Sequence, residues 1–163
     1  MNKLTDGLTN LIFFIFFALV TSLSVSSYQY SDAQTNKTHS QVSCPNNLPI
    51  TGVSSSPSQN NFPPTKAVDN DTNSKWWSTN SLNPSIRLDL ASTRTVCAVG
   101  IAFADGNLHP YKFVISTSND GTKFVDTVAG ISNGTTTAAE KYVFPPVHAK
   151  FVKITVTQHT RSD

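Results

Sequence analysis

Short segments in which apolar and polar residues alternate recur through the second half of this sequence, and they constrain the fold more than any other feature. In Ser85–Leu90 the alternation places Ile86, Leu88 and Leu90 on one side of an extended chain, which is typical of a half-buried strand. Further strand-sized segments at a spacing of about ten residues predict an all-β fold, a β-sandwich. They are Thr95–Phe103, Tyr111–Thr117, Lys123–Val128, Lys141–Phe144 and Phe151–Thr157.

The residues between these segments predict where the strands end. The sequence NDG at 119–121 predicts a hairpin turn, because Asp-Gly suits the backbone angles of tight turns. The two prolines at 145–146 predict a break before the last strand, because proline cannot donate a hydrogen bond to a strand ladder. In that last strand we expect Phe151, Ile154 and Val156 to point inward.

The composition supports strands over helices and excludes several classes of protein. Glu140 is the only Glu, and charged residues make up 13% of the chain, about half the usual share of about 25%. The 12 Lys and Arg are scattered and the net charge is +2, which argues against a nucleic-acid partner because such proteins cluster their basic residues. Two Cys and one Met exclude a zinc ribbon or an iron–sulfur protein.

The N-terminus has the features of a secretory signal peptide. Lys3 precedes an unbroken apolar run, Leu11–Val20. Even when extended to Val25, this segment would span about 22 Å as a helix, which is less than the hydrocarbon core of about 30 Å. We expect cleavage after Ala33, so residues 1–33 would be removed and residues 34–43 would form a flexible lead-in to a secreted or cell-surface domain at 44–163. An uncleaved N-terminal anchor is the alternative.

Export changes the interpretation of the two cysteines. Cys44 and Cys97 are the only cysteines in the chain, and disulfides are the usual state of paired cysteines outside the cytoplasm. We therefore predict a Cys44–Cys97 disulfide. Two buried free thiols are the alternative.

The segment KAVDNDTNSKWW at 66–77 differs from an ordinary strand or turn. Asp69, Asp71 and Ser74 lie close together in the sequence, and calcium prefers several oxygen ligands from such a loop. The spacing is not that of an EF-hand, since the following Gly and the distant Glu are missing. On spacing alone, a solvated loop of Asx-turns is the stronger interpretation.

Four segments in a fixed order resemble the F5/8 type C, or discoidin, domain. They are AVDNDTNSKW at 67–76, IRLDL at 86–90, FVISTSNDGTKF at 113–124 and FVKITVT at 151–157. The combination is fairly specific, because an acidic loop ending in Trp, a strand ending in Asp-Leu and a Ser-x-Asp-Gly hairpin occur in register. The resemblance covers about Cys44 to Thr157 and implies a jelly-roll type, galactose-binding-like β-sandwich, the fold of family 32 carbohydrate-binding modules.

The resemblance also implies a structural calcium ion. In carbohydrate-binding members of the family the acidic loop holds calcium, which here implicates the carbonyl of Lys66 with Asp69, Asp71 and Ser74. Members normally end in a strand with a Ser-x-Glu segment, whose Glu often completes the metal site. This sequence ends at Asp163 without a second Glu, so we expect either that the domain is truncated at its C-terminus or that it lacks its terminal strand.

The resemblance places the ligand on loops at one end of the sandwich. The loop Ala104–Pro110 corresponds to the loop that supplies polar contacts in sugar-binding members. Asp105, Asn107 and His109 are residue types that bind sugar hydroxyls, and Trp77 is a candidate stacking platform. The alternatives are that Trp77 is a second core aromatic and that His109 is an ordinary loop residue.

These features favour a binding module over an enzyme. The nucleophile-elbow, HExxH and phosphate-loop motifs are absent from the sequence. We expect a secreted module that binds a neutral glycan. The alternatives are an adhesion or structural module with a cell-surface protein partner, and a phospholipid-surface binder that uses Leu82 and Leu108 as apolar contacts.

Overall fold

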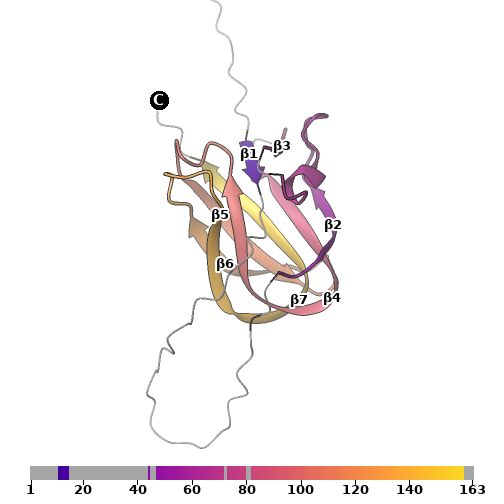
Figure 1. Cartoon of the computed structure of the whole chain (residues 1–163). Helices are drawn as coiled ribbons and strands as arrows, with labels where there is room; N and C mark the ends of the chain where they lie inside the picture. Colours follow the sequence, from indigo (N-terminus) through magenta and orange to yellow (C-terminus); the bar gives the residue numbers. More distant parts are fainter. Residues whose placement is uncertain (1–10, 15–43, 45–46, 72, 80–81, 160–163) are drawn as a thin grey trace, which may run out of the picture.

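The computed structural model confirms that the chain is all-β (Figure 1). It describes residues 11–14, 44, 47–71, 73–79 and 82–159. Within these residues the chain forms seven strands and a short 3-10 helix, η1 (Pro64–Ala67). The strands are β1 (Leu11–Phe14), β2 (Ile50–Ser55), β3 (Trp76–Ser78), β4 (Ser85–Phe103), β5 (Tyr111–Ser118), β6 (Val125–Ile131) and β7 (Glu140–His159).

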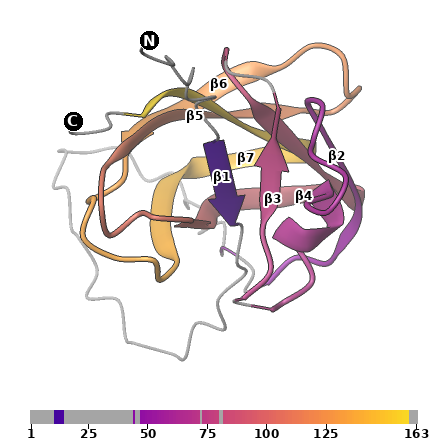
Figure 2. The ribbon, with the colours of Figure 1, turned by 90° about the horizontal axis from the view of Figure 1, so that it is seen from above.

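Two long strands, β4 and β7, connect the two layers of the sandwich. The first part of β4 pairs with the end of β7 and with β2, and β7 continues through β5 to β6. The second part of β4 pairs with the start of β7, and its last residues pair with β1, which in turn pairs with β3. All these pairs are antiparallel. Seen from above, β1 and β3 lie side by side next to η1 (Figure 2).

The predicted break at Pro145 and Pro146 is wrong, since β7 runs through both prolines. Val96 pairs with Val147, but Ala98 pairs with Val143. The ladder is therefore irregular where the prolines lie, and their missing N–H groups fall in a bulge where a proline costs little. The segments at 85–90 and 95–103, predicted as two strands, are likewise one strand with a register shift between Asp89 and Arg94.

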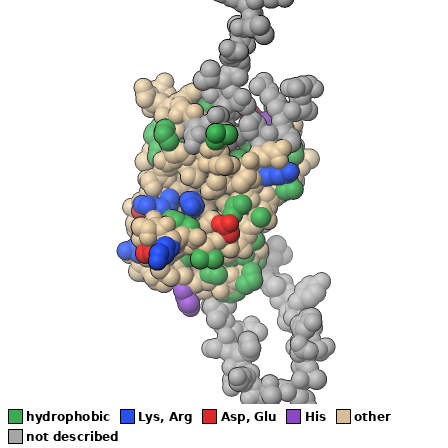
Figure 3. All heavy atoms as spheres, turned by 180° about the vertical axis from the view of Figure 1, so that it is seen from behind, with side chains coloured by type: hydrophobic (Ala, Val, Ile, Leu, Met, Phe, Trp, Pro, Cys, Tyr) green, Lys and Arg blue, Asp and Glu red, His purple; other side chains and the backbone are tan. Residues whose placement is uncertain are grey.

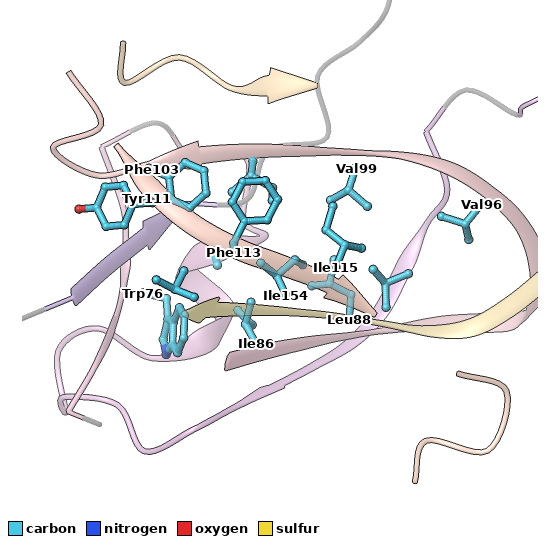
Figure 4. Packing of buried hydrophobic residues seen from close by; sticks show 14 of the residues in the cluster. Trp76, Ile86, Leu88, Val96, Val99, Phe103, Tyr111, Phe113, Ile115 and Ile154 are labelled. Atoms are coloured by element: carbon cyan, nitrogen blue, oxygen red, sulfur yellow. The ribbon is translucent and has the colours of Figure 1, made fainter. Parts of the chain in front are cut away.

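The core follows the predicted alternation at most positions. Ile86, Leu88 and Leu90 are buried, as are Ile154 and Val156. These side chains join one apolar cluster with Trp76, Phe103, Tyr111, Phe113 and Ile115 (Figure 4). The predicted inward position of Phe151 is wrong. It pairs with Asp89 and Ser118 on the outer face, because Val152 takes the inward position beside it.

The predicted disulfide between Cys44 and Cys97 is confirmed. The two Cα atoms are 6.0 Å apart, a separation that a disulfide spans readily. The bond ties the start of the domain to the buried middle of β4. A disulfide of this kind is typical of an extracellular protein.

The N-terminal predictions fall mainly outside the described residues. Most of the predicted signal peptide (1–33) and the whole predicted lead-in (34–43) lie there. The described part of the apolar run, Leu11–Phe14, forms β1 between β3 and β4. In the described part of the chain, no helix has the length and apolar character needed to cross a membrane.

The exposed surface is mainly uncharged. On the face shown in Figure 3, most side chains are neutral and polar or small, and Lys and Arg side chains gather in one area with acidic side chains beside them. This distribution agrees with the low charged fraction of the sequence.

Candidate functional site

The acidic loop that follows η1 brings three oxygen-bearing groups together. The Ser74 hydroxyl oxygen lies 2.7 Å from the Lys66 carbonyl oxygen, and 2.8 and 2.9 Å from the two carboxylate oxygens of Asp69. Ser74 is buried, whereas Asp69 is exposed. Residues eight positions apart in the sequence therefore converge on one point, and three of the four predicted calcium ligands take part.

Asp71, the fourth predicted ligand, is used differently. Its Oδ1 accepts hydrogen bonds from the backbone and side-chain nitrogens of Asn73, and its own amide donates to Asp69 Oδ1. These are two successive Asx-turns, the interpretation that the spacing of the residues alone favours. Asn70 between them has φ of 62°, a left-handed conformation that Asn tolerates.

The acidic loop offers the kind of ligand atoms that a hard cation prefers. Among the described residues, no group of three or more His, Cys, Asp or Glu lies in one place. The acidic loop itself offers two carboxylates, one hydroxyl and one carbonyl. All are oxygens, which calcium prefers, although calcium takes more of them than converge here. Burial opposes ionisation of Asp69, but hydrogen bonds from Ser74 and the Asp71 amide, with the Lys66 ammonium 3.6 Å away, lower the pKa of Asp69 below its ordinary value.

The second candidate region is the loop Ala104–Pro110, which joins β4 to β5. Its first residues form a tight turn, in which Gly106 N donates to the Phe103 carbonyl and Leu108 N donates to the Asp105 carbonyl. Asp105 has φ of 56°, which is again the left-handed region. The turn leaves the side chains of Asp105 and Asn107 exposed to solvent.

Tyr111 holds this loop in place from its buried side. Its hydroxyl donates to the Ala104 carbonyl at 2.8 Å, and His109 Nε2 lies 2.9 Å from the same hydroxyl. The ring is buried and stacks on Phe103 (Figure 4). Burial, and then the negative charge of Asp105, raise the pKa of Tyr111 well above its ordinary value, so the hydroxyl keeps its proton.

A neighbouring loop supports the Ala104–Pro110 loop from the side. The Tyr111 amide donates to Ser132 Oγ, and the Ser132 amide donates to the Tyr111 carbonyl. A Cβ on Gly106 would lie 2.7 Å from the Thr136 carbonyl oxygen and 2.8 Å from that of Phe103. Glycine at 106 is therefore what allows the two loops to pack backbone against backbone.

Trp77 lies on the opposite side of β3 from the buried Trp76. It is half-buried, with its ring centroid 5.3 Å from that of Phe62 and 5.4 Å from the Lys75 ammonium. Its Nε1 is buried and has no acceptor among the described residues. Trp77 is thus neither a fully exposed platform nor a fully buried core residue.

The register of β1 relates Trp77 to the Ala104–Pro110 loop. Phe13 of β1 pairs with Trp76 on one side and with Phe103 on the other. Trp77 follows Trp76 and Ala104 follows Phe103, so Trp77 and Ala104 lie at the same height along the strands. One strand, β1, separates them, which corresponds to about 10 Å. In the uncleaved chain, which contains β1, this register places Trp77 level with the start of the Ala104–Pro110 loop.

Several residues that support the site were missed by the sequence analysis. Tyr111 was assigned only to a strand, and Gly106 and Phe62 were assigned no role. Gly106 carried a signal, since a glycine inside a polar loop often marks a close backbone approach. The contacts of Tyr111 and Phe62 depend on the tertiary structure. Leu82 and Leu108, the candidate membrane contacts, are 78% and 66% exposed.

Comparisons with known proteins support the carbohydrate-binding resemblance. The family 32 carbohydrate-binding module of AlyQ, solved in complex with 4,5-unsaturated mannuronic acid, is similar at 28% identity and a TM-score of 0.66, covering 69% of this chain and 86% of that one. A pectin-binding module is similar at 22% identity and a TM-score of 0.64, covering 69% and 82%.

A third solved structure is the family 32 module of Clostridium perfringens NanJ in complex with galactose. It shares 22% identity, with a TM-score of 0.58, and the match covers 66% of this chain and 82% of that one. The fold is thus a galactose-binding-like β-sandwich, as predicted. Other similar structures are parts of enzymes, such as a truncated AlyQ that also contains an alginate lyase domain. A comparison with curated protein sequences found no match.

A family model decides the classification. The model described as "F5/8 type C domain" matches residues 50–163, which is most of the chain. The match includes β2 through β7, together with the acidic loop and the Ala104–Pro110 loop. The chain belongs to the F5/8 type C domain family.

Proposed function

We propose that this domain is a secreted or cell-surface module that binds a neutral glycan without cleaving it, through the loop Ala104–Pro110. The observation that carries the proposal is the exposure of Asp105 and Asn107 on a loop that is held by hydrogen bonds at both ends. Polar side chains on a braced loop, positioned by a rigid sandwich, form the kind of site that binding modules use.

The chemistry of these side chains suits sugar hydroxyls. An ionised Asp105 accepts hydrogen bonds from two hydroxyl protons, and the Asn107 amide both donates and accepts. His109 is half-buried and in contact with the Tyr111 hydroxyl, so it contributes an oriented ring at the side of the loop. Trp77, level with the start of the loop, would contact the apolar face of a sugar with the exposed part of its indole.

The charge of the loop favours a neutral ligand. Asp105 is its only charged side chain, and an exposed carboxylate repels a carboxylate on a sugar. The AlyQ module was solved with an acidic sugar, and this supports the glycan class for the present chain. A shallow loop site buries little ligand surface, so we expect micromolar to millimolar affinity.

We also propose that the acidic loop binds a structural calcium ion through the Lys66 carbonyl, Asp69, Asp71 and Ser74. The convergence of three of these groups within hydrogen-bond distance supports the proposal. Calcium would replace the hydrogen bonds that the Ser74 hydroxyl now donates, and the hydroxyl would bind the ion through its oxygen while keeping its proton. It would stabilise the loop that leads into β3 and Trp77, and it would take no chemical part in ligand binding.

The test is an NMR titration of the full chain with a panel of neutral and acidic mono- and oligosaccharides, including galactose and mannuronate. We expect neutral sugars to shift the amides of residues 104–110. Asn107→Ala should weaken this binding, and Trp77→Ala should weaken it for ligands that have an apolar face. Ser92→Ala is the control, because Ser92 is exposed in the middle of β4, outside the Ala104–Pro110 loop.

Two outcomes would overturn the proposal. Shifts confined to residues outside 104–110 would show that another surface binds the sugar. Binding to phospholipid vesicles that is lost in Leu82→Ser and Leu108→Ser, without shifts for any sugar, would favour the membrane alternative. Protein binding that survives Asn107→Ala, again without sugar binding, would favour the adhesion alternative.

A further inference from the structure

Two cations lie directly opposite each other on the outer face of the sheet, away from the loops described above. Arg87 of β4 pairs with Lys153 of β7, and Lys153 pairs with Ser116 of β5. On the other side, Arg87 pairs with Ser54 of β2. Ser116 is buried and pairs in turn with the exposed Asp126 of β6, whose carboxylate accepts a hydrogen bond from the Ser116 hydroxyl at 2.7 Å. The row across five strands therefore reads hydroxyl, guanidinium, ammonium, hydroxyl, carboxylate.

Aromatic rings hold these cations in place. The Arg87 guanidinium carbon lies 5.1 Å from the centroid of the Phe151 ring, and the Lys150 ammonium lies 5.7 Å from the same centroid. The Lys153 ammonium lies 4.2 Å from the centroid of Phe124. Contacts of this kind restrict long, flexible side chains. We call Arg87, Lys150 and Lys153, with the two rings, the cationic face.

The protein neutralises the cationic face only in part. Arg87 alone is paired, with its Nε and Nη2 donating to the two carboxylate oxygens of Asp89 at 2.8 and 3.1 Å. Neither Lys150 nor Lys153 forms an ion pair among the described residues. Like charges directly opposite each other lower the stability of a sheet. Residues that lower stability without an evident structural gain nearby are typical of a functional surface.

We propose that the cationic face binds an acidic polysaccharide whose carboxylates lie along the Arg87–Lys153 row. Neighbouring strands are about 4.8 Å apart, so the row presents two positive charges a short distance apart to an extended chain. Ser54 is exposed at the end of the row, where its hydroxyl is available to a sugar hydroxyl. A row of polar side chains that crosses several strands fits an extended polymer better than it fits a single sugar.

The choice of a carboxylate follows from Asp89. The Arg87 guanidinium already binds one carboxylate, that of Asp89, through two parallel hydrogen bonds. A ligand carboxylate is the group that suits this planar guanidinium geometry. Arg87 uses two of its five N–H groups on Asp89 and keeps the others for a ligand. The nearby carboxylates and the small net charge of +2 disfavour a longer, denser polyanion such as nucleic acid.

This inference rests on the proposed function in one respect, since both treat the domain as a glycan-binding module. The two surfaces differ in place and in charge. The Ala104–Pro110 loop follows the second part of β4, and the cationic face uses the first part of β4, where it pairs with β2 and the end of β7. Variants of one surface therefore leave the other intact.

The experiment is a titration of the full chain with a purified oligomannuronate, followed by NMR and calorimetry at low salt and at physiological salt. We expect amide shifts on β4 and β7 around residues 87 and 153, and weaker binding as salt rises. The double variant Lys150→Gln/Lys153→Gln should weaken binding by about tenfold or more. Lys153→Arg should keep most of it.

Lys141→Gln is the matched control, because Lys141 is an exposed lysine on the first part of β7. If this control loses as much affinity as the Lys153 variants, the interaction is general charge attraction and the inference is wrong. Tighter binding of a sulfated oligosaccharide, or equal binding of vesicles that contain anionic lipid, would also overturn the choice of ligand. A folded wild-type protein that binds no oligomannuronate at low salt would overturn the inference as a whole.

The proposed function would fail in a different way. Asn107→Ala should reduce binding of the neutral sugar and leave oligomannuronate binding unchanged. If the neutral panel gives no shifts while oligomannuronate still binds at β4 and β7, the loop proposal fails and the cationic face stands. The reverse result overturns the cationic face alone.

Discussion

The Ser74 hydroxyl oxygen lies within 2.9 Å of both carboxylate oxygens of Asp69. The Lys66 carbonyl oxygen is closer still, at 2.7 Å. A serine hydroxyl has one proton, so it can donate to only one of these three acceptors at a time. The Ser74 hydroxyl therefore meets more acceptor oxygens than it has protons to donate, and a cation would complete this arrangement.

Calcium should raise the thermal stability of the domain, and Asp69→Ala should remove the effect. A ligand that binds only the native state stabilises it by about 2.7 kcal/mol at a hundredfold excess over its Kd. The measurement is the melting temperature with calcium and with a chelator. Asp105→Asn is the control, since Asp105 is an exposed carboxylate outside the acidic loop. An equal melting temperature in calcium and chelator would mean that the Asx-turns alone organise the loop.

Gly106→Ala should distort the loop between β4 and β5. The added Cβ would meet two backbone carbonyl oxygens at 2.7 and 2.8 Å, and overpacking of this kind costs about 1–3 kcal/mol. We expect a lower denaturation midpoint and weaker sugar binding. The control is Gly52→Ala, because its Cβ would meet the Asp89 side chain at 3.3 Å, which can shift. Unchanged amide shifts at 104–110 in Gly106→Ala would contradict this prediction.

Tyr111→Phe should make the Ala104–Pro110 loop more mobile without leaving a cavity in the core. The variant keeps the ring that stacks on Phe103 but loses the hydrogen bond to the Ala104 carbonyl and the contact of the hydroxyl with His109 Nε2. Loss of one such bond costs about 0.5–1.5 kcal/mol, and more if the carbonyl stays unpaired. Amide hydrogen exchange should become faster at 104–110. In Tyr142→Phe, the control, exchange in this loop should be unchanged.

Asp120 should contribute to stability at neutral pH and lose this contribution in acid. Hydrogen bonds from the Lys123 and Thr122 amides, then from the Ser118 hydroxyl, hold its pKa well below the ordinary value. Because the folded-state pKa is lowered, the stability is present above the ordinary pKa and is lost as the pH falls toward the folded-state pKa. Melting curves at falling pH should therefore decline less steeply for Asp120→Asn than for the wild type. Equal slopes would show that the turn does not depend on the charge.

The Cys44–Cys97 disulfide should be present in the secreted protein and should stabilise it. Intact mass after alkylation without reduction should show no modified thiol. Cys44→Ser/Cys97→Ser should lower the free energy of unfolding by about 2–5 kcal/mol, because the bond restricts the unfolded chain. Two alkylated thiols in the unreduced protein would contradict the assignment.

Strand positions could be predicted because they depend on local residue patterns. Ile86, Leu88 and Leu90 share one face in any extended chain, whatever that face packs against. The turn at 119–121 was equally local, and Asp120 shows why β6 begins only at Val125. Its carboxylate accepts the amides of Thr122 and Lys123, which keeps both residues in the turn.

The residues themselves thus determined the all-β class, the alternation of the core and the disulfide, since two cysteines allow one pairing. The tertiary structure alone decided which residues meet across strands. Register places Pro145 and Pro146 in a bulge, puts Lys153 opposite Arg87 and sets Trp77 level with Ala104. The physical reason is that register depends on contacts between segments far apart in the chain, which no local pattern of side chains contains.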